Sequence, residues 1–422
     1  MRHIKKHKSH LEYNLQINNV NGILQSLSIN LVLPFANMYA KRLNASDNDI
    51  ALLSSYPAIF CIIAVIFGTH LFRKYSNKKM LTAISFAFGR GFFLIFILVP
   101  FLPLWLQPGL FVFLYGMMNF PISIANMGWQ SFLADLFPNK WRGRAFSKRN
   151  SLSTAAALLV TFLTGSLLYY IPHNNAERIH LYQIFFLIAF ILAGFEIYSF
   201  TLHKLDKNSA QVETITASNN DSILYELKHM SHIVFSNKNF LNFCVCVVIF
   251  HFAWQMGWPL LFSYEYDVLH SNEFWTSIIS TASFICQTIA FIFWQKYSEK
   301  KGNSYVMFVA AMLMSFCPFL YIFATHISQV VVFNIITATA YAGTFLMLTN
   351  SLYEVAPDEN RTVYIAFYTI ITNITLVAAP LLGMQLKHLF NIRTALFIDG
   401  TLRVLAGLIF YMRYKYYKKN KS

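Results

Sequence analysis

The sequence predicts an all-α polytopic membrane protein with twelve transmembrane helices in two pseudo-symmetric six-helix bundles. Apolar residues make up 56% of the chain and charged residues only 12%, whereas about a quarter of an ordinary globular domain is charged. The apolar residues form runs of roughly 20, the length that crosses a bilayer as a helix. One spacing (acid, two residues, Pro, three residues, Arg) occurs at 135–142 and again at 354–361, so a tandem duplication is predicted.

Twelve apolar segments are expected to span the membrane, and one polar segment divides them into six and six. Residues 203–238 hold no apolar run and are predicted to link an N-terminal bundle at 1–202 to a C-terminal bundle at 239–422. The spans are expected at about 18–40, 49–72, 80–102, 108–134, 150–171, 181–202, 240–263, 274–295, 303–324, 328–350, 363–386 and 395–413.

The positive charges predict the orientation of the helices. Most of the 33 Lys and Arg residues fall on one side of the predicted spans, together with both termini. Lys and Arg gather on the cytoplasmic side of membrane helices, so we expect a multi-pass protein of the cell (cytoplasmic) membrane with its N- and C-termini in the cytoplasm. The net charge of +15 is then a basic rim facing anionic lipid, and nucleic acid is not expected as a partner. The other side carries Lys41, Arg42, Arg178, Lys387 and Arg393.

The cysteines predict neither a disulfide nor a metal site. All five lie inside apolar runs, and none belongs to a Cys-x-x-Cys pair. We interpret Cys61, Cys244, Cys246, Cys286 and Cys317 as small buried apolar residues. No cofactor and no metal are therefore expected.

The repeated motif resembles the loops that follow helices 4 and 10 in the major facilitator superfamily. The family pattern acid-x-x-Pro-x-x-x-Arg-Gly is matched by Asp135, Pro138, Arg142 and Gly143, and its second copy by Glu354, Pro357 and Arg361, with Thr362 in place of Gly. The family's motif between helices 2 and 3 keeps only its basic part, because Arg73 stands at the acidic position. The family's acid-based latch is therefore not expected in that loop. The resemblance implies the major facilitator fold and secondary active transport by alternating access.

These loops lead to a hypothesis about gating. An acid at the cytoplasmic end of helix 4 or 10 can pair with Arg or Lys of a neighbouring loop when that side is closed. Exposed pairs contribute only about 0–1 kcal/mol each, which is enough to bias two states of similar free energy. The alternative is a solvated loop that only obeys the charge bias. The residues expected at this cytoplasmic gate are Asp135, Arg142, Glu354, Arg361, Lys74 and Lys296.

Polar residues recur at helical spacing in helices 1, 4, 7 and 10, which the resemblance places around a central cavity with helices 2, 5, 8 and 11 beside them. An unpaired polar group facing lipid is costly, so these residues should turn toward the cavity or toward a neighbouring helix. No carboxylate lies midway along the four cavity helices, and no Arg lines them, which disfavours cationic drugs and phosphorylated or dicarboxylate substrates. The residues expected to line a polar, aromatic-edged substrate cavity are Asn30, Asn126, Gln130, His251, Gln255, Trp258, Tyr341 and Asn373.

Ionisable residues within the spans are functional candidates. Asp399 and Arg403 stand four residues apart and can pair along one helix. Arg90 and Arg403 fall on helices that the resemblance places at the periphery of each bundle, and Glu196 and Asp399 are the nearest acids within the spans. We expect structural ties within each bundle, and the alternative is proton coupling through Glu196, Asp399 or His251, whose charge can change near neutral pH.

The function expected from this resemblance is secondary active transport of a small neutral or zwitterionic, amphipathic solute, as proton-coupled export (efflux). One alternative is uptake of a sugar or another nutrient by the same fold. Others are a sensor or assembly partner that does not transport, and a polytopic membrane enzyme. The nearest groups for an enzyme, Glu265, Asp267 and His270, are interpreted as a solvated loop. We therefore do not expect an enzyme. We expect a monomer whose partners are a small-molecule substrate, the lipid bilayer and protons.

Overall fold

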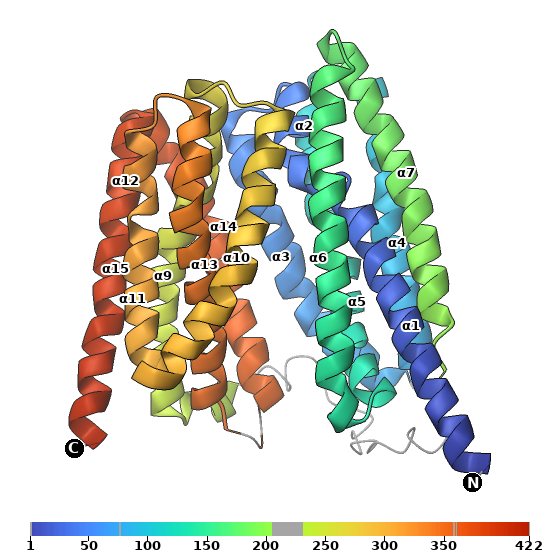
Figure 1. Cartoon of the computed structure of the whole chain (residues 1–422). Coiled ribbons are helices and arrows are strands. Elements are labelled where there is room, and N and C mark those ends of the chain that lie inside the picture. The colour runs from blue at the N-terminus through green and yellow to red at the C-terminus, as the bar shows by residue number, and fades with distance from the viewer. Residues whose placement is uncertain (1, 76, 205–230, 358, 360, 422) are drawn as a thin grey trace. The chain divides into compact units, whose positions relative to one another are not determined.

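The computed structural model confirms the all-helical membrane fold. It describes the chain except for residues 1, 76, 205–230, 358, 360 and 422 (Figure 1), and the described residues form helices and no strand. Twelve helices in this part of the chain are long and apolar enough to cross a membrane, as the apolar runs predict. The predicted linker at 203–238 lies mostly outside the described residues.

The chain divides into two compact units. The first contains residues 1–44 and 63–223, and the second contains residues 45–62 and 224–422. Helix α3 (Asp47–Lys74) therefore begins in the second unit and ends in the first. The predicted boundary between an N-terminal bundle at 1–202 and a C-terminal bundle at 239–422 stays a prediction.

In the first unit, the predicted first span is a broken helix. α1 (Arg2–Asn30) starts well before the predicted residue 18 and is followed by the short 3-10 turn η1 (Leu33–Phe35) and by α2 (Ala36–Arg42). Pro34 sits within η1, and proline has no amide hydrogen to continue a helix. The other helices of this unit are α4 (Lys78–Leu98) with the turn η2 (Val99–Phe101), α5 (Gln107–Leu136), α6 (Asn139–Tyr170) and α7 (Asn175–Thr201).

The second unit contains the elements from α9 onward (Figure 1). α9 (Lys238–Ser263) continues into a π-helical turn, η3 (Tyr264–Val268), so the helical backbone extends beyond the predicted end of this span. The ninth span is interrupted ahead of Pro318 and consists of α11 (Asn303–Ser315) and α12 (Cys317–Ile322). The remaining helices are α10 (Glu273–Lys301), α13 (Ile327–Val355), α14 (Arg361–Leu389) and α15 (Ile392–Lys421).

Asparagine side chains start several of these helices. Asn77, Asn174, Asn237 and Asn272 are the N-caps of α4, α7, α9 and α10, and each accepts a hydrogen bond from the backbone N–H three residues on. Such a cap contributes about 0.5–2 kcal/mol. It also satisfies amides that have no partner within the helix.

Aromatic side chains form much of the core. In the first unit the ring of Tyr39 packs edge-on against Phe111 and Phe186, with centroids 4.8 Å and 5.2 Å away. In the second unit the rings of Phe240 and Tyr364 meet in the same way at 4.7 Å. Close packing rather than a hydrophobic driving force holds helices together in lipid, so these contacts set the positions of the polar side chains between them.

A buried histidine follows the C-terminal end of α7. His203 is 2% exposed, its Nδ1 lies 2.9 Å from the carbonyl oxygen of Phe200, and its ring packs against Trp129. The Nζ of Lys79 donates to the carbonyl oxygen of His203 at 2.8 Å. Burial is the largest cause that lowers the pKa of His203 from 6.5 to about 4, and the charge of Lys79 acts in the same direction.

We predict that the protein loses stability as the pH falls from 6.5 to about 4. Unfolded His203 binds a proton near pH 6.5, whereas the folded side chain does so only near 4, so protonation favours the unfolded state within this window. The loss should reach roughly 3 kcal/mol at the acid end. Thermal unfolding of the purified protein across this range should show a flatter profile for His203→Gln. The exposed His180 supplies the control, because His180→Gln should follow the wild-type curve; a wild-type curve for His203→Gln would contradict the assignment.

Candidate functional site

The second unit holds a hydrogen-bonded group built around Gln255 of α9. Its Nε2 lies 3.3 Å from the carbonyl oxygen of Thr372 and 3.1 Å from Nδ1 of His251, and its Oε1 accepts from the hydroxyl of Thr375 at 2.7 Å. A carbonyl can only accept, so Gln255 must present its NH₂ group to Thr372 and to His251. Nδ1 of His251 is therefore an acceptor, and the neutral imidazole carries its proton on Nε2.

The Nε2–H group of His251 has no acceptor within the described part of the chain. His251 is 9% exposed, and its ring lies beside Trp254 at 5.3 Å and Tyr368 at 6.3 Å between centroids. Trp254 in turn contacts Trp258 and Tyr341 edge-on at 5.6 Å and 5.7 Å. Because Trp258 is 38% exposed, this group combines one buried donor with an accessible aromatic face.

A buried ion pair lies beside the same helix, α9. Arg403 and Asp399 of α15 are joined at 2.9 Å, and Nη2 of Arg403 also donates to the carbonyl oxygen of Trp254 at 2.9 Å. Gly257 makes this approach possible, since a Cβ there would lie 2.0 Å from Nη2 of Arg403. The i, i+4 pairing expected from the sequence is present, and it ties α15 to the backbone of α9.

The groups interpreted as a solvated loop after α9 are instead drawn into contacts. Oε1 of Glu265 accepts from the hydroxyl of Tyr321 at 2.7 Å, and Asp267 forms an ion pair with Lys387 at 2.8 Å. His270 is exposed. The interpretation is wrong for Glu265, because the helical backbone continues to Val268 and carries this side chain onto α12. Asp267 is paired but exposed.

Lys387 of α14 contacts two acids at once. Its Nζ lies 2.6 Å from Asp47 at the start of α3 and 2.8 Å from Asp267. All three residues belong to the second unit. The contact attaches the beginning of α3 to α14 and to the turn η3.

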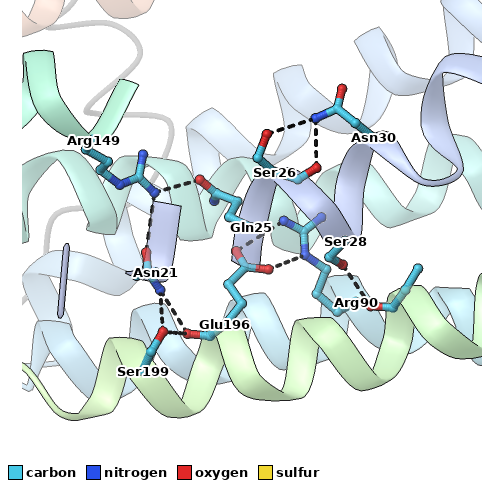
Figure 2. A network of polar contacts seen from close by, with 10 residues as sticks. Asn21, Gln25, Ser26, Ser28, Asn30, Arg90, Arg149, Glu196 and Ser199 are labelled. Carbon is cyan, nitrogen blue, oxygen red and sulfur yellow. Dashed lines mark hydrogen bonds and ion pairs between the residues drawn. The ribbon is translucent and has the colours of Figure 1, made fainter. Parts of the chain in front are cut away.

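The first unit holds its own buried polar network, drawn in Figure 2. Arg90 of α4 and Glu196 of α7 meet side-on, with Nε and Nη2 of Arg90 lying 3.1 Å and 3.3 Å from the two carboxylate oxygens. Nδ2 of Asn21 on α1 donates to the carbonyl oxygen of Glu196 at 2.8 Å and to the hydroxyl of Ser199 at 3.1 Å. The network joins three helices, as expected for a structural tie.

Arg149 is a functional candidate that sequence reasoning missed. Its position near the start of the predicted fifth span placed it in the basic rim, yet the structure buries it to 8% exposure. Nη2 of Arg149 donates to Oε1 of Gln25 at 2.7 Å and lies 3.3 Å from Oδ1 of Asn21 (Figure 2). The available signal was the polar stripe of α1, on which Asn18, Asn21 and Gln25 recur at helical spacing and require a polar partner.

The other residues expected in the cavity divide into two groups. Asn126 and Gln130 of α5 are exposed, as a solvent-facing stripe requires. Nδ2 of Asn30 and of Asn373 each donates to a carbonyl oxygen one turn back in its own helix, at 2.9 Å and 2.8 Å. Tyr341 is half-buried. The central cavity itself stays a prediction.

The residues expected at the gate have the following surroundings. Nε of Arg142 donates to the carbonyl oxygen of Phe137 at 2.8 Å, and Oε1 of Glu354 accepts from Nδ2 of Asn303 at 2.5 Å. Arg361 lies over the ring of Tyr353 at 5.9 Å, and Lys74 and Lys296 are exposed. The side chain of Asp135 falls outside the described part of the structure, so the gate stays a prediction.

Within the described residues, no group of three or more His, Cys, Asp and Glu side chains could hold a metal ion. The five cysteines are free thiols, and Cys244, Cys246 and Cys317 are buried. The polar group around Gln255 and the network around Glu196 are therefore held by hydrogen bonds and ion pairs. Both lie on helices that cross a membrane.

Comparison with known proteins identifies the class. The family model of the Major Facilitator Superfamily matches residues 20–272 and 243–422, so the chain belongs to this superfamily of membrane transporters. Family and fold indicate a transporter rather than an enzyme. No curated protein sequence matches this chain.

Solved structures of transporters share the fold. The nucleoside transporter NupG has a TM-score of 0.69 at 13% identity, covering 96% of this chain and 99% of that one. The xylose transporter XylE from E. coli, in an inward-open conformation, has a TM-score of 0.67 at 16% identity, covering 95% of each chain. A POT family transporter in complex with a thioalcohol-conjugated peptide has a TM-score of 0.70 at 12% identity, covering 94% and 95%. At these identities the likeness shows the fold alone.

We predict that Asp399→Asn lowers the free energy of unfolding by about 3–5 kcal/mol, because it leaves the buried charge of Arg403 without a partner. The double substitution Asp399→Asn with Arg403→Gln should recover much of this loss. The measurement is chemical or thermal unfolding of the purified variants in one detergent. A double variant less stable than Asp399→Asn would show that Arg403 holds α9 independently of its acid.

Proposed function

We propose that the protein moves a small neutral or zwitterionic, amphipathic solute across the cytoplasmic membrane by alternating access, as a monomeric proton-coupled exporter. Membership of the superfamily supports transport. The observation that carries the chemistry of the solute is the Nε2–H donor of His251, buried without an acceptor beside Trp254 and near the accessible ring of Trp258.

This donor favours a solute that carries a hydrogen-bond acceptor on an apolar or planar framework. A buried donor without a partner costs about 1–3 kcal/mol, and an acceptor on the solute would remove that cost. Aromatic rings offer a large apolar surface with defined geometry. Both features agree with an amphipathic solute and with the absence of a carboxylate midway along α9 and α13.

The proton fits the buried acids better than His251. A second proton on the imidazole would have to sit on Nδ1, where the NH₂ group of Gln255 already points at it. Protonation of Asp399 or Glu196 would instead release Arg403 or Arg90. An ion pair that ties helices in one state can in this way carry a proton in another, and the loops with Asp135 and Glu354 would bias the same equilibrium as a cytoplasmic gate.

Uptake of a nutrient is the second candidate. The structural neighbours include a nucleoside transporter and a D-xylose–proton symporter, and sugars and nucleosides also present acceptors on a ring. The group around His251 and the buried ion pairs would serve uptake as well. The ion gradient would set the direction of transport.

We predict that the purified protein in proteoliposomes exchanges a solute of this class and that an imposed pH gradient drives net transport. A counterflow screen over sugars, nucleosides, amino acids and dipeptides identifies the solute. Trp258→Ala should then raise the KM roughly tenfold, the effect of losing an aromatic contact of about 1–2 kcal/mol. Phe88 of α4 is 70% exposed and serves as the control, since Phe88→Ala should not change the KM. Absence of exchange for the whole screen would favour the sensor hypothesis.

We predict separately that His251→Gln transports with an unchanged pH profile, while His251→Leu loses most of its affinity. Glutamine keeps an NH donor near the position of Nε2, whereas leucine keeps the volume and removes the donor. Initial rates measured from pH 5.5 to 8, in steps of about half a unit across the range in which histidine titrates, supply the comparison. A flattened profile for His251→Gln would instead assign the coupled proton to this imidazole.

A further inference from the structure

The first unit buries one more positive charge than its acids can neutralise. Arg90, Arg149 and Glu196 are the charged side chains buried in its core among the residues that the structure describes. Glu196 gives both carboxylate oxygens to Arg90. Arg149 is left with the neutral amides of Asn21 and Gln25.

The surroundings of Arg149 are shaped to hold a guanidinium group. Its charged group lies 4.8 Å from the centroid of the Trp129 ring, a cation–π contact that orients it. Gly22 of α1 makes room for the side chain, because a Cβ there would lie 2.6 Å from Cγ of Arg149 and 2.7 Å from the hydroxyl oxygen of Ser153. The close approach of α6 to α1 at this point depends on that glycine.

The site is nevertheless incomplete. Nε of Arg149 is buried, and no hydrogen-bond acceptor for it exists in the described part of the chain. The amide oxygens of Asn21 and Gln25 satisfy Nη2 but carry no net charge. Arginine cannot lose its proton in a protein. Glu196 attracts the charge of Arg149, but both of its carboxylate oxygens already bond Arg90, so two buried arginines share one acid and one positive charge stays uncompensated. An anion is the one ligand that would correct both deficits.

We propose that Arg149 binds a carboxylate group of the transported solute. A carboxylate is planar and accepts two parallel hydrogen bonds from a guanidinium group, as Glu196 does from Arg90. One surplus positive charge matches one carboxylate, so the solute carries a carboxylate, as amino acids and peptides do and as sugars and nucleosides do not. This assignment rests on the proposed function and narrows its substrate class. Gln25, which accepts from Nη2 of Arg149, is half-buried and not fully enclosed.

The first experiment compares two arginines of the same unit in the absence of solute. Arg149→Gln removes the surplus charge, so its melting temperature should equal or exceed that of the wild type. Arg90→Gln strands Glu196 and should melt well below the wild type. A loss for Arg149→Gln as large as that for Arg90→Gln would make Arg149 a structural tie and overturn the proposal.

The second experiment uses matched probes that differ by one carboxylate. A panel of apolar L-amino acids and dipeptides, each beside its C-terminal amide, is tested for thermal stabilisation of the protein in phosphatidylcholine nanodiscs. At least one acid should stabilise the wild type while its amide does not, and Arg149→Gln should weaken its binding roughly tenfold or more. Arg149→Lys, which keeps the charge without the fork of donors, should retain part of the affinity.

Several outcomes would overturn this assignment. They are an amide as effective as its acid, an acid that stabilises Arg149→Gln equally, and a panel in which no acid stabilises the wild type. Another such outcome is thermal stabilisation that depends on Arg149 and is produced by phosphatidylglycerol in the nanodisc or by chloride alone. The anion would then be a lipid headgroup or an inorganic ion.

Transport measurements separate this proposal from the proposed function. If xylose or uridine is exchanged at equal rates by the wild type and Arg149→Gln, the carboxylate site fails while transport stands. If an acid binds through Arg149 but is not exchanged in counterflow, a carboxylate site exists without transport of its ligand, and the proposed function fails.

Discussion

Buried ion pairs hold the helices of each unit together, because a charge inside an apolar phase must find its counter-charge within the protein. Arg90 and Glu196 join α4 to α7 at 3.1 Å. Asp399 and Arg403 pair within α15, and the guanidinium group reaches the backbone of α9 at 2.9 Å. The amides of α1 and the glycine at 257 are arranged around these charges.

Against this background, Arg149 and His251 are two of the buried polar groups whose hydrogen bonding is incomplete. Each is more than nine-tenths buried, and each keeps one nitrogen without an acceptor among the described residues. A side chain that serves only to join helices would gain from a complete set of bonds. Among the buried groups left incomplete, these two are therefore the candidates for contact with a solute.

The two groups differ in the chemistry that they offer. The contact with Gln255 holds His251 as a neutral donor, which suits a carbonyl or hydroxyl oxygen. Arg149 is permanently charged and suits a carboxylate.

The membrane class, the number of spans and the family could be predicted from the sequence alone, because helix length, apolar runs and loop motifs are properties of short segments. The sequence also indicated the i, i+4 pair of Asp399 and Arg403, which is local. Three features could be learned only from the packed helices. Arg149 is buried in the core and does not belong to the basic rim, Glu265 accepts a hydrogen bond from Tyr321, and Gln255 determines the tautomer of His251. These outcomes depend on which helices pack together and how deeply a long side chain reaches between them, and no spacing along one segment encodes that.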